Sequence, residues 1–322
     1  MKYGRIDGIE KPVSRMGQGT IMLRPDEQDA AFALLDAVFE GGVNLFDTAY
    51  LYNGGDCERA FGAWLAGRGV RGDVVVIAKG GHPRGGESGV RAEVVREELA
   101  VSLDRMGIDR ADLYLLHRDD ANVPVGEIVD FMSEHVRAGR ICAWGGSNWT
   151  QERIREANDY AAANGLVPVA ASSPQFSLAV PVRPIWTDCL TIAGPDAADA
   201  RDWYRRTGLP VVTWSSIARG FLSGRVSRDD DSALEAAARG AFSHPENFDR
   251  LERAARLARE KGASVPQLAI AYVLGYPLNI FALVGPCTPD EARKNRAAVD
   301  IELRPDEIVW LEQGGDLRGI SG

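Results

Sequence analysis

Short runs of apolar residues alternate with longer amphipathic stretches from one end of the chain to the other. A short apolar run bounded by turn residues predicts a buried strand, whereas apolar positions three or four residues apart predict a helix. Eight runs predict strands, at residues 15–19, 43–47, 74–79, 112–117, 141–147, 168–173, 210–214 and 280–285.

The stretches between these runs have the helical pattern. In residues 90–106 the side chains of Val95, Leu99 and Met106 fall on one face of a helix, with charged residues on the other. A later helix is expected to begin at Ser264, because Ser264 and Gln267 have the spacing of a capping box and Pro266 suits the first turn.

Eight strands that alternate with helices build either a closed barrel or an open doubly wound sheet. An open sheet that binds a dinucleotide usually carries GxGxxG after its first strand. Here Gly17-Gln18-Gly19-Thr20-Ile21-Met22 lacks the third glycine, and no GxxxxGK loop occurs. The pattern therefore favours an α/β fold of the (β/α)8 TIM-barrel type. No linker or low-complexity tract divides the chain, so we expect one domain over residues 1–322.

Two predicted connections are long, at residues 176–206 and 219–246. Long loops at the carboxyl-terminal face of a barrel often bind ligands, although surface insertions are also common. The sequence leaves both interpretations open for each connection.

Composition excludes several classes of protein. The 322 residues are 45% hydrophobic and 26% charged, with a formal net charge of -9. An acidic chain lacks the basic face of a nucleic-acid binder, and no apolar run approaches the ~18 residues of a membrane span. The first residues lack the apolar core of a signal peptide, and the four cysteines form no CxxC pair. We therefore expect a cytoplasmic protein with no metal site and no nucleic-acid or membrane partner. The oligomeric state has no signal in the sequence.

Residues suited to ligand contacts follow the predicted strands. In a barrel the carboxyl ends of the strands face the active-site mouth. The residues at these ends are Asp47, Lys79, His117, Ser147, Asn148, Gln175, Trp214, Ser215 and Gly285. A chance scatter of surface residues would not favour strand ends in this way.

Lys79 is one of only five lysines and ends an apolar run. A buried ammonium needs a carboxylate partner or loses its proton, and Asp47 is the natural partner. The pair is either a structural ion pair or part of an active site. His117 is likewise either a structural histidine or a catalytic one. Tyr50 and Tyr52 both follow Asp47, and periodicity does not choose between them as a proton donor.

The stretch FDTAYLYNGGDCE resembles the signature of the aldo-keto reductase family. The resemblance continues in order through VVIAKG, YLLHRDD, GGSNW, SSPQFSLA, WSSIARGFLSGR and VGPCTPDEARKN, so it covers nearly the whole chain. It implies an NAD(P)H-dependent oxidoreductase that reduces an aldehyde or ketone to an alcohol, or catalyses the reverse reaction.

The family's spacing implies that Tyr52, not Tyr50, is the proton donor, in a tetrad of Asp47, Tyr52, Lys79 and His117. A phenol with a pKa near 10 is a poor acid at neutral pH. We expect the Lys79 ammonium to lower the pKa of Tyr52 by favouring the phenolate, Asp47 to hold Lys79, and His117 to orient the substrate oxygen.

The same resemblance implies the cofactor contacts. Ser147, Asn148 and Gln175 resemble the residues that hold the nicotinamide carboxamide, and Trp214 the ring that stacks on the nicotinamide. Backbone amides and Arg225 in the loop that contains Ser215, Ile217, Gly220 and Ser223 are expected to bind the pyrophosphate. The adenosine end is expected at Gly285, Cys287, Glu291 and Asn295. Gly19, Thr20 and Asp47 complete the set.

Two residues depart from the family's pattern. Asn53 stands where the signature usually has glycine, and Glu291 stands where many relatives place arginine or glutamine against the 2′-phosphate of NADP(H). A carboxylate repels a phosphate but accepts a hydrogen bond from a free ribose hydroxyl. Family habit favours NADP(H), whereas Glu291 is compatible with NAD(H).

Tyr50, Trp149 and Trp186 are the expected substrate contacts, and three aromatic rings at the mouth suit a sugar ring or a cyclic ketone. Trp149 has the alternative role of covering the next helix. Two other functions stay open. One is a cofactor-binding regulatory subunit that resembles the potassium-channel β subunits, and the other is an isomerase or aldolase that forms a Schiff base on Lys79.

Overall fold

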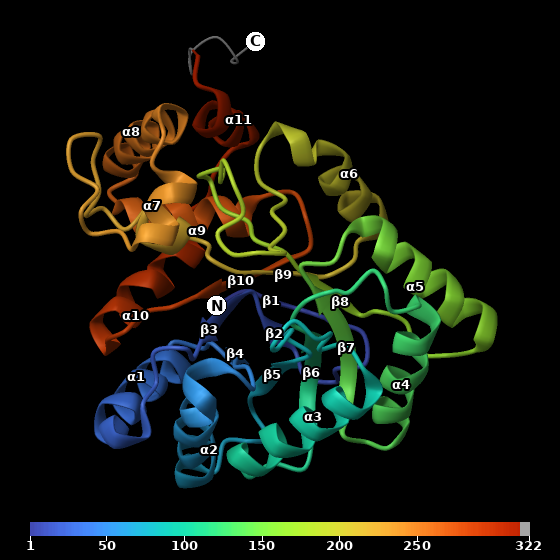
Figure 1. Ribbon diagram of the computed structural model, residues 1–322. Coiled ribbons are helices and arrows are strands. Elements are labelled where there is room, and N and C mark those ends of the chain that lie inside the picture. Colours follow the sequence, from blue (N-terminus) through green and yellow to red (C-terminus); the bar gives the residue numbers. More distant parts are fainter. Residues whose placement is uncertain (316–322) are drawn as a thin grey trace.

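Eight parallel strands close into a barrel in the computed structural model, which describes residues 1–315 (Figure 1). In order around the barrel they are β3 (Met16–Gly19), β4 (Leu45–Asp47), β5 (Val75–Gly80), β6 (Ala111–Leu116), β7 (Ile141–Ser147), β8 (Ala171–Ser173), β9 (Val211–Thr213) and β10 (Ile280–Val284). β10 pairs with both β9 and β3, which closes the ring. The expected TIM barrel is confirmed, and each expected strand is present with its bounds shifted by at most three residues.

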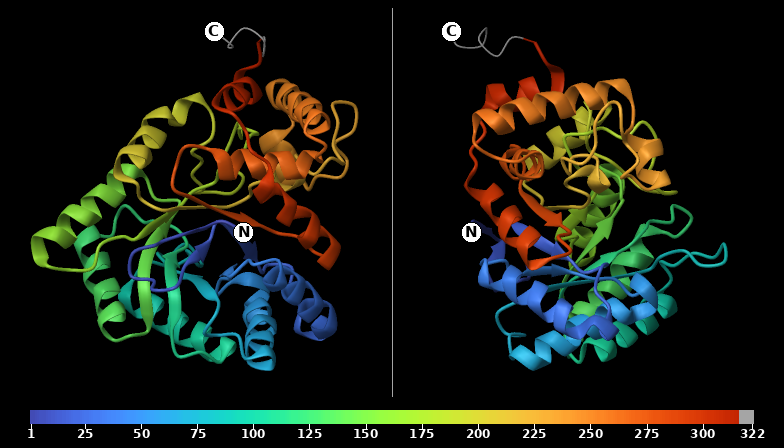
Figure 2. Two further views of the ribbon diagram at one scale, coloured as in Figure 1. Left: turned by 180° about the vertical axis from the view of Figure 1, so that it is seen from behind. Right: turned by 90° about the vertical axis from the view of Figure 1, so that its left-hand side faces the viewer.

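Helices surround the barrel in all three views (Figures 1 and 2). They are α1 (Gln28–Glu40), α2 (Asp56–Arg68), α3 (Ala92–Met106), α4 (Val125–Arg137), α5 (Gln151–Asn164), α6 (Ala198–Thr207), α7 (Ala236–Phe242), α8 (Pro245–Glu260), α9 (Val265–Gly275), α10 (Pro289–Arg296) and α11 (Pro305–Gln313). α9 begins as the sequence predicts, because the backbone N–H of Ser264 donates to Oε1 of Gln267 at 2.9 Å.

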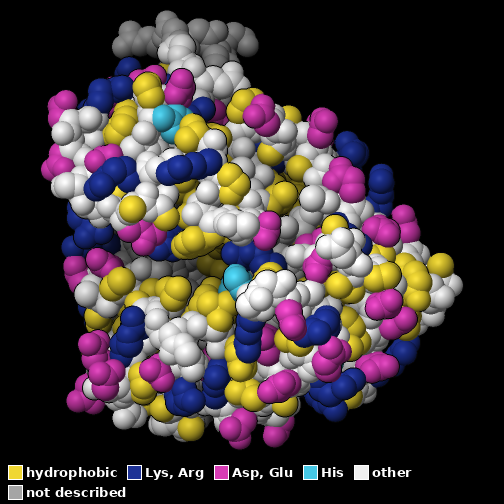
Figure 3. Space-filling model, viewed as in Figure 1, with side chains coloured by type: hydrophobic (Ala, Val, Ile, Leu, Met, Phe, Trp, Pro, Cys, Tyr) yellow, Lys and Arg dark blue, Asp and Glu magenta, His cyan; other side chains and the backbone are white. Residues whose placement is uncertain are grey.

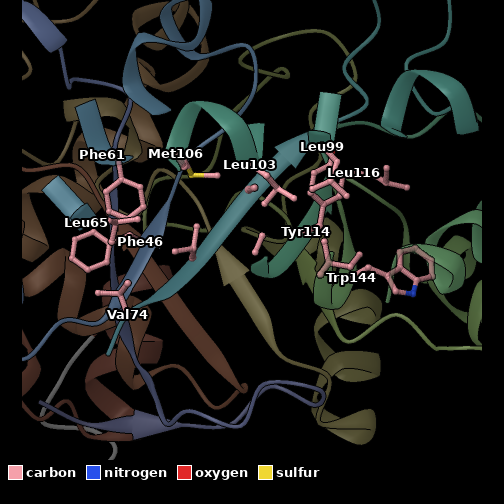
Figure 4. Packing of buried hydrophobic residues seen from close by; sticks show 14 of the residues in the cluster. Phe46, Phe61, Leu65, Val74, Leu99, Leu103, Met106, Tyr114, Leu116 and Trp144 are labelled. Atoms are coloured by element: carbon pink, nitrogen blue, oxygen red, sulfur yellow. The ribbon is translucent and has the colours of Figure 1, made fainter. Parts of the chain in front are cut away.

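Each barrel strand is buried on both faces, so alternate side chains enter two different parts of the core. Leu45, Ile77 and Leu115 belong to the cluster inside the barrel. Their neighbours Phe46 and Tyr114 point outward and pack against the helices (Figure 4). The same alternation directs Asp47, Lys79 and His117 inward, because each lies two residues beyond an inward-facing side chain.

A short antiparallel hairpin, β1 (Tyr3–Gly4) and β2 (Val13–Ser14), precedes the barrel and lies behind it in Figure 1. Ile6, Ile9 and Val13 pack into the cluster inside the barrel. The backbone N–H of Ser14 donates to the side chain of Asn44, which directly precedes β4, at 2.8 Å. The hairpin therefore closes the amino-terminal end of the barrel. The sequence did not predict it, because two-residue strands carry no periodic signal.

The two long connections contain more regular structure than the sequence suggested. The end of the first forms α6, and part of the second forms α7. Apolar side chains from both connections, among them Phe176 and Phe221, pack with α8 and α9 in a second outer cluster. This burial gives both connections a structural role. Within residues 1–315 no helix has both the length and the apolarity to cross a membrane.

Candidate active site

Asp47 and Lys79 form an ion pair at the carboxyl ends of the adjacent strands β4 and β5. Both residues are only 4% exposed. Burial alone lowers the pKa of Lys79, but the Asp47 carboxylate and the Tyr52 phenol outweigh that effect, so the pKa lies above its ordinary value. Lys79 is therefore a stable ammonium rather than the neutral amine that a Schiff base requires.

Tyr52 lies in the turn after β4 and faces this ion pair. Nζ of Lys79 is 5.1 Å from the centroid of the Tyr52 ring, and the His117 ring is 5.8 Å from it at an angle of 75°. Burial raises the pKa of Tyr52, while the Lys79 ammonium acts to lower it. Lys79 therefore acts on the Tyr52 pKa in the direction that we expected. Burial has the larger effect, however, so the prediction that the Tyr52 pKa is lowered is wrong for the protein without ligands.

Asn53 preserves the turn that carries Tyr52 despite replacing the usual glycine. Its backbone φ is 47°, in the left-handed region that asparagine tolerates better than most residues. Its side-chain Nδ2 donates to the carbonyl oxygen of Ile21 at 2.7 Å. The departure at this position therefore leaves the position of Tyr52 intact.

The ring of Tyr50 lies between two guanidinium groups, away from Tyr52. Arg84 and Arg105 each lie 4.5 Å from its centroid, and these arginines pair with the buried carboxylates of Glu98 and Glu58. Arg105 also donates to the carbonyl oxygen of Tyr50 at 2.8 Å. We call these five residues the Tyr50 clamp. Because two guanidinium groups lie over the Tyr50 ring, the structure does not leave that ring free as a stacking surface for substrate.

His117 contributes a neutral imidazole to the site. Burial, the Lys79 ammonium and the Arg118 guanidinium hold its pKa well below the ordinary value. Its buried Nδ1 has no hydrogen-bond partner among residues 1–315. The His82 ring lies 5.5 Å away, edge-on to the His117 ring. His82 is not among the residues that the sequence predicted for the site, although its position three residues after Lys79 is a weak signal for it.

The three residues expected at the nicotinamide carboxamide lie at or just beyond the carboxyl ends of the neighbouring strands β7 and β8. Nδ2 of Asn148 donates to Oγ of Ser147 at 3.1 Å, and Gln175 pairs with the chain at Trp214. Their amide oxygens already accept hydrogen bonds from residues 190 and 191, at 3.1 and 2.5 Å. The loop before α6 therefore touches the same amides that the sequence assigns to a cofactor.

The three aromatic rings beyond Tyr50 have different surroundings. Trp186 is 42% exposed and its ring lies 5.9 Å from that of Trp214, at 30° between the planes. Trp149 is fully buried, and its Nε1 donates to the carbonyl oxygen of Arg118 at 3.2 Å. Of the three predicted substrate contacts, the structure thus leaves only Trp186 with its ring exposed near Trp214. The burial of Trp149 is in keeping with its alternative role of covering the next helix.

The loop after β9 contains several residues with left-handed backbone conformations. Ser215, Ala218 and Arg219 have φ values of 56°, 52° and 51°, and Gly220 has 94°. Left-handed non-glycine residues are uncommon and gather at functional sites, and successive N–H groups in such turns form concavities that bind anions. Ile217 and Ser223 belong to the same loop. The pyrophosphate prediction therefore coincides with this strained segment.

Glu291 lies in the first turn of α10, and its carboxylate points back toward the preceding loop. Its Oε2 accepts a hydrogen bond from the backbone N–H of Cys287 at 2.7 Å, and its own N–H donates to Oγ1 of Thr288 at 3.2 Å. Burial and Glu291 raise the pKa of the Cys287 thiol, whereas the charge of Arg225 lowers it. A cation and an anion thus both lie close to Cys287. Gly285 follows β10, and Asn295 lies in α10.

Figure 3 shows the face of the molecule that carries the carboxyl ends of the strands. The surface is hollowed near its centre, with hydrophobic side chains along the upper rim and a histidine at one end. A separate cavity of about 390 Å³ lies between α6, α8 and α11, and none of the predicted site residues lines it. Among residues 1–315 no group of three His, Cys, Asp or Glu side chains is arranged to hold a metal ion.

Comparison with known proteins gives one family over almost the whole chain. A sequence model described as the Aldo/keto reductase family matches residues 15–313. The aldo-keto reductase str7 of Strobilurus tenacellus is 27% identical over 96% of this chain and 88% of its own length. A probable voltage-gated potassium channel subunit beta of Oryza sativa subsp. japonica is 29% identical over 96% of this chain and 94% of its own length.

A solved structure has the same barrel. The glycerol dehydrogenase AKR11B4 from Gluconobacter oxydans superposes with a TM-score of 0.77 at 24% sequence identity, over 98% of this chain and 97% of that protein. At this level of identity the likeness supports the fold alone.

Proposed function

The chain belongs to the aldo/keto reductase family and is an NAD(P)H-dependent oxidoreductase, and from that premise we propose that it reduces an aldehyde or ketone to an alcohol, or catalyses the reverse, with Tyr52 as the proton donor. The observation that carries the proposal is the position of the Lys79 ammonium, which contacts the Asp47 carboxylate and faces the Tyr52 ring.

These residues suit proton transfer to a developing alkoxide. In the resting site Tyr52 is protonated, because burial raises its pKa. As the phenol gives its proton to the substrate oxygen, the phenolate that remains is stabilised by the Lys79 ammonium. Asp47 fixes the ammonium and keeps it charged. The neutral imidazole of His117 can donate a hydrogen bond to the same oxygen and hold it beside Tyr52.

The bound nicotinamide cofactor supplies the hydride that the carbonyl carbon receives. Gln175 donates with one N–H of Nε2 to Ser177, which leaves its second N–H for a carboxamide oxygen. Trp214 offers a ring, and the left-handed backbone after Ser215 offers N–H groups to a pyrophosphate. The buried hydroxyl of Thr20 lacks a partner among residues 1–315, which supports its inclusion in the site.

We propose that both cofactors bind and that NADP(H) is slightly preferred. Arg225 supplies a cation near Cys287. The charge of Glu291 opposes a 2′-phosphate, but the N–H of Cys287 already occupies one of its oxygens. For the substrate, the sugar or cyclic-ketone class now rests on Trp186 alone. Cytoplasmic location and a single domain stay predictions.

The second candidate is a cofactor-binding regulatory subunit, which the printed name of the rice relative favours. The convergence of Asp47, Tyr52, Lys79 and His117 favours catalysis instead, because cofactor binding alone does not require a proton donor held against an ammonium.

Fluorescence titration of the purified protein with NADPH and NADH tests the cofactor, followed by turnover on a panel of aldehydes and ketones. We expect saturable quenching of Trp214 fluorescence and turnover of at least one carbonyl compound. Binding without turnover across the panel would favour the regulatory subunit. Failure of both cofactors to bind at up to low-millimolar concentration would contradict both candidates.

A further inference from the structure

Arg118, the residue after His117, is a buried cation that has no carboxylate partner within residues 1–315. The residue is only 7% exposed. Nη1 donates to the carbonyl oxygen of His117 at 2.8 Å. The nearest acidic residue in sequence, Asp119, pairs with Arg153 at 3.2 Å instead. No carboxylate among residues 1–315 lies within ion-pair distance of Arg118.

The other buried cation of the described chain, Lys79, does have a carboxylate partner. Lys79 and Arg118 are the only buried lysine or arginine residues in residues 1–315. Lys79 has the carboxylate of Asp47 against it. Arg105, which is slightly more exposed, has Glu58 at 2.8 Å. A charge removed from water without a counter-charge is costly, so the missing anion at Arg118 needs an explanation.

Arg118 lies at the substrate side of the candidate active site. Its charge lowers the pKa of His117, and it is the main charge that opposes the effect of burial on the thiol pKa of Cys189. The N–H of Cys189 donates to the carbonyl oxygen of Trp186 at 3.2 Å. The guanidinium donates to the carbonyl oxygen of His117. Asn148 donates to the same oxygen and accepts from the N–H of Leu190, in the loop that carries the exposed Trp186.

The backbone around Arg118 is fixed before any ligand arrives. Nε1 of Trp149 donates to the carbonyl oxygen of Arg118, and Nδ2 of Asn148 donates to that of His117 at 3.3 Å. The guanidinium itself makes one hydrogen bond, from Nη1 to the carbonyl oxygen of His117. Its other N–H groups lie in a plane whose geometry matches a carboxylate or a phosphate.

We propose that Arg118 binds an anionic group of the substrate, so that the preferred substrate is a small aldehyde or ketone that bears a carboxylate or phosphate. This proposal rests on the proposed function and names its substrate class. The ligand supplies the counter-charge that the chain lacks, while its carbonyl oxygen lies against His117 and Tyr52, next to Arg118 in the site.

Matched pairs of substrates test the proposal. One pair is 4-carboxybenzaldehyde and methyl 4-formylbenzoate, and the other is glyceraldehyde 3-phosphate and glyceraldehyde. For at least one pair we expect kcat/KM to be about tenfold or more higher for the anionic member. The Arg118→Met variant should lower this ratio by about tenfold or more, and Arg118→Lys should retain part of it. The first pair reports a carboxylate and the second a phosphate.

Arg155→Met is the matched control, because Arg155 is an exposed arginine on α5. It should leave the ratio unchanged. Equal kcat/KM for charged and neutral members of both pairs, or a ratio that Arg118→Met does not alter, would overturn the proposal while the oxidoreductase function stands. Urea unfolding of each variant shows that it is folded, and Arg118→Gln replaces Arg118→Met if the latter is not.

A binding measurement separates this proposal from the proposed function. Calorimetric titration with benzoate and with inorganic phosphate, in the presence of NADPH, requires no turnover. Binding of either anion that Arg118→Met weakens about tenfold supports the anion site even if no carbonyl compound is reduced. Absence of binding by both anions, together with no charge preference in turnover, would contradict it.

Discussion

The chemistry of the site depends on how single residues are protonated. Tyr52 stays a phenol because burial raises its pKa, and the Lys79 ammonium beside it stabilises the phenolate once the proton has left. His117 stays neutral because burial and neighbouring cations hold its pKa well below 6.5. At neutral pH the site therefore combines one proton donor, one cation and one neutral hydrogen-bond donor, which is the combination that carbonyl reduction requires.

Replacing Tyr52 with phenylalanine removes the proton donor and leaves the ring. We expect kcat to fall by roughly 10²- to 10⁴-fold, the usual contribution of general acid catalysis. Cofactor affinity should be retained, because the proposed cofactor contacts lie elsewhere. Steady-state kinetics and a cofactor fluorescence titration measure the two effects. Retained kcat would remove Tyr52 from the mechanism and direct attention to Tyr50.

His117 should make stability depend on pH. Between pH 6.5 and its lowered native pKa, the unfolded chain binds a proton that the native protein does not. The free energy of unfolding therefore falls as the pH drops through this window, by up to about 1.4 kcal/mol per pH unit. His117→Gln should reduce this dependence, which urea unfolding at pH 7 and pH 5.5 measures. Burial also lowers the pKa of His135. Because His135 is present in both the unaltered protein and the variant, its contribution to the pH dependence cancels in the comparison. Equal pH dependence would mean that His117 titrates normally in the native state.

At the scale of elements, the position of Tyr52 depends on the loop between β4 and α2. The Tyr50 clamp ties this loop to α3 through Arg105 and to the loop after β5 through Arg84. Each cation over an aromatic face contributes roughly 0.5–2 kcal/mol. Glu98 also accepts a hydrogen bond from the N–H of Gly81 at 2.7 Å, next to His82. The clamp thus connects the two loops that carry Tyr52 and His82.

Shortening Tyr50 should disturb catalysis through position alone. Tyr50→Ala removes the ring between the two guanidinium groups, and a small displacement of Tyr52 should lower kcat by roughly ten- to a hundredfold. Cofactor affinity should change little. Tyr50→Phe is the matched control, because it keeps the ring and should keep kcat and KM near those of the unaltered protein. A rise in KM for substrate in Tyr50→Phe would instead show that the hydroxyl contacts substrate, as the sequence first suggested.

At the scale of the whole molecule, the proposed cofactor contacts come from six strands or the segments that follow them: β3, β4, β7, β8, β9 and β10. A ligand that touches elements so far apart in sequence binds only the folded barrel, and its binding energy therefore adds to the free energy of unfolding. The loop that contacts Asn148 and Gln175 packs in the second outer cluster. We therefore expect cofactor binding to stabilise that part of the molecule as well.

NADPH at a hundred times its dissociation constant should raise the free energy of unfolding by about 2.7 kcal/mol. Thermal unfolding with NADPH or NADH at equal concentrations compares the two cofactors. Glu291→Gln keeps an oxygen for the N–H of Cys287 but removes the charge. It should increase the stabilisation by NADPH relative to that by NADH. An unchanged ratio would mean that Glu291 does not face the ribose.

The sequence by itself determined the barrel and the residues that point into its mouth. Side chains alternate along a strand with a period of two, so the apolar runs that end at Asp47, Lys79 and His117 also decide that these three residues face inward. Strand order follows from chain order in a barrel, which makes β4, β5 and β6 neighbours. Local pattern and simple topology were sufficient for this part of the site.

Only the tertiary structure decided which contacts the side chains of the loop residues make. Tyr50 and Tyr52 are two residues apart, yet the first enters a clamp with Arg105 of α3 and the second faces Lys79. Trp149 is buried, and among residues 1–315 no carboxylate pairs with Arg118. These outcomes depend on contacts between segments distant in sequence. Loop backbones have no fixed periodicity, so the pattern of residues along a loop does not specify which distant side chain each of its residues meets.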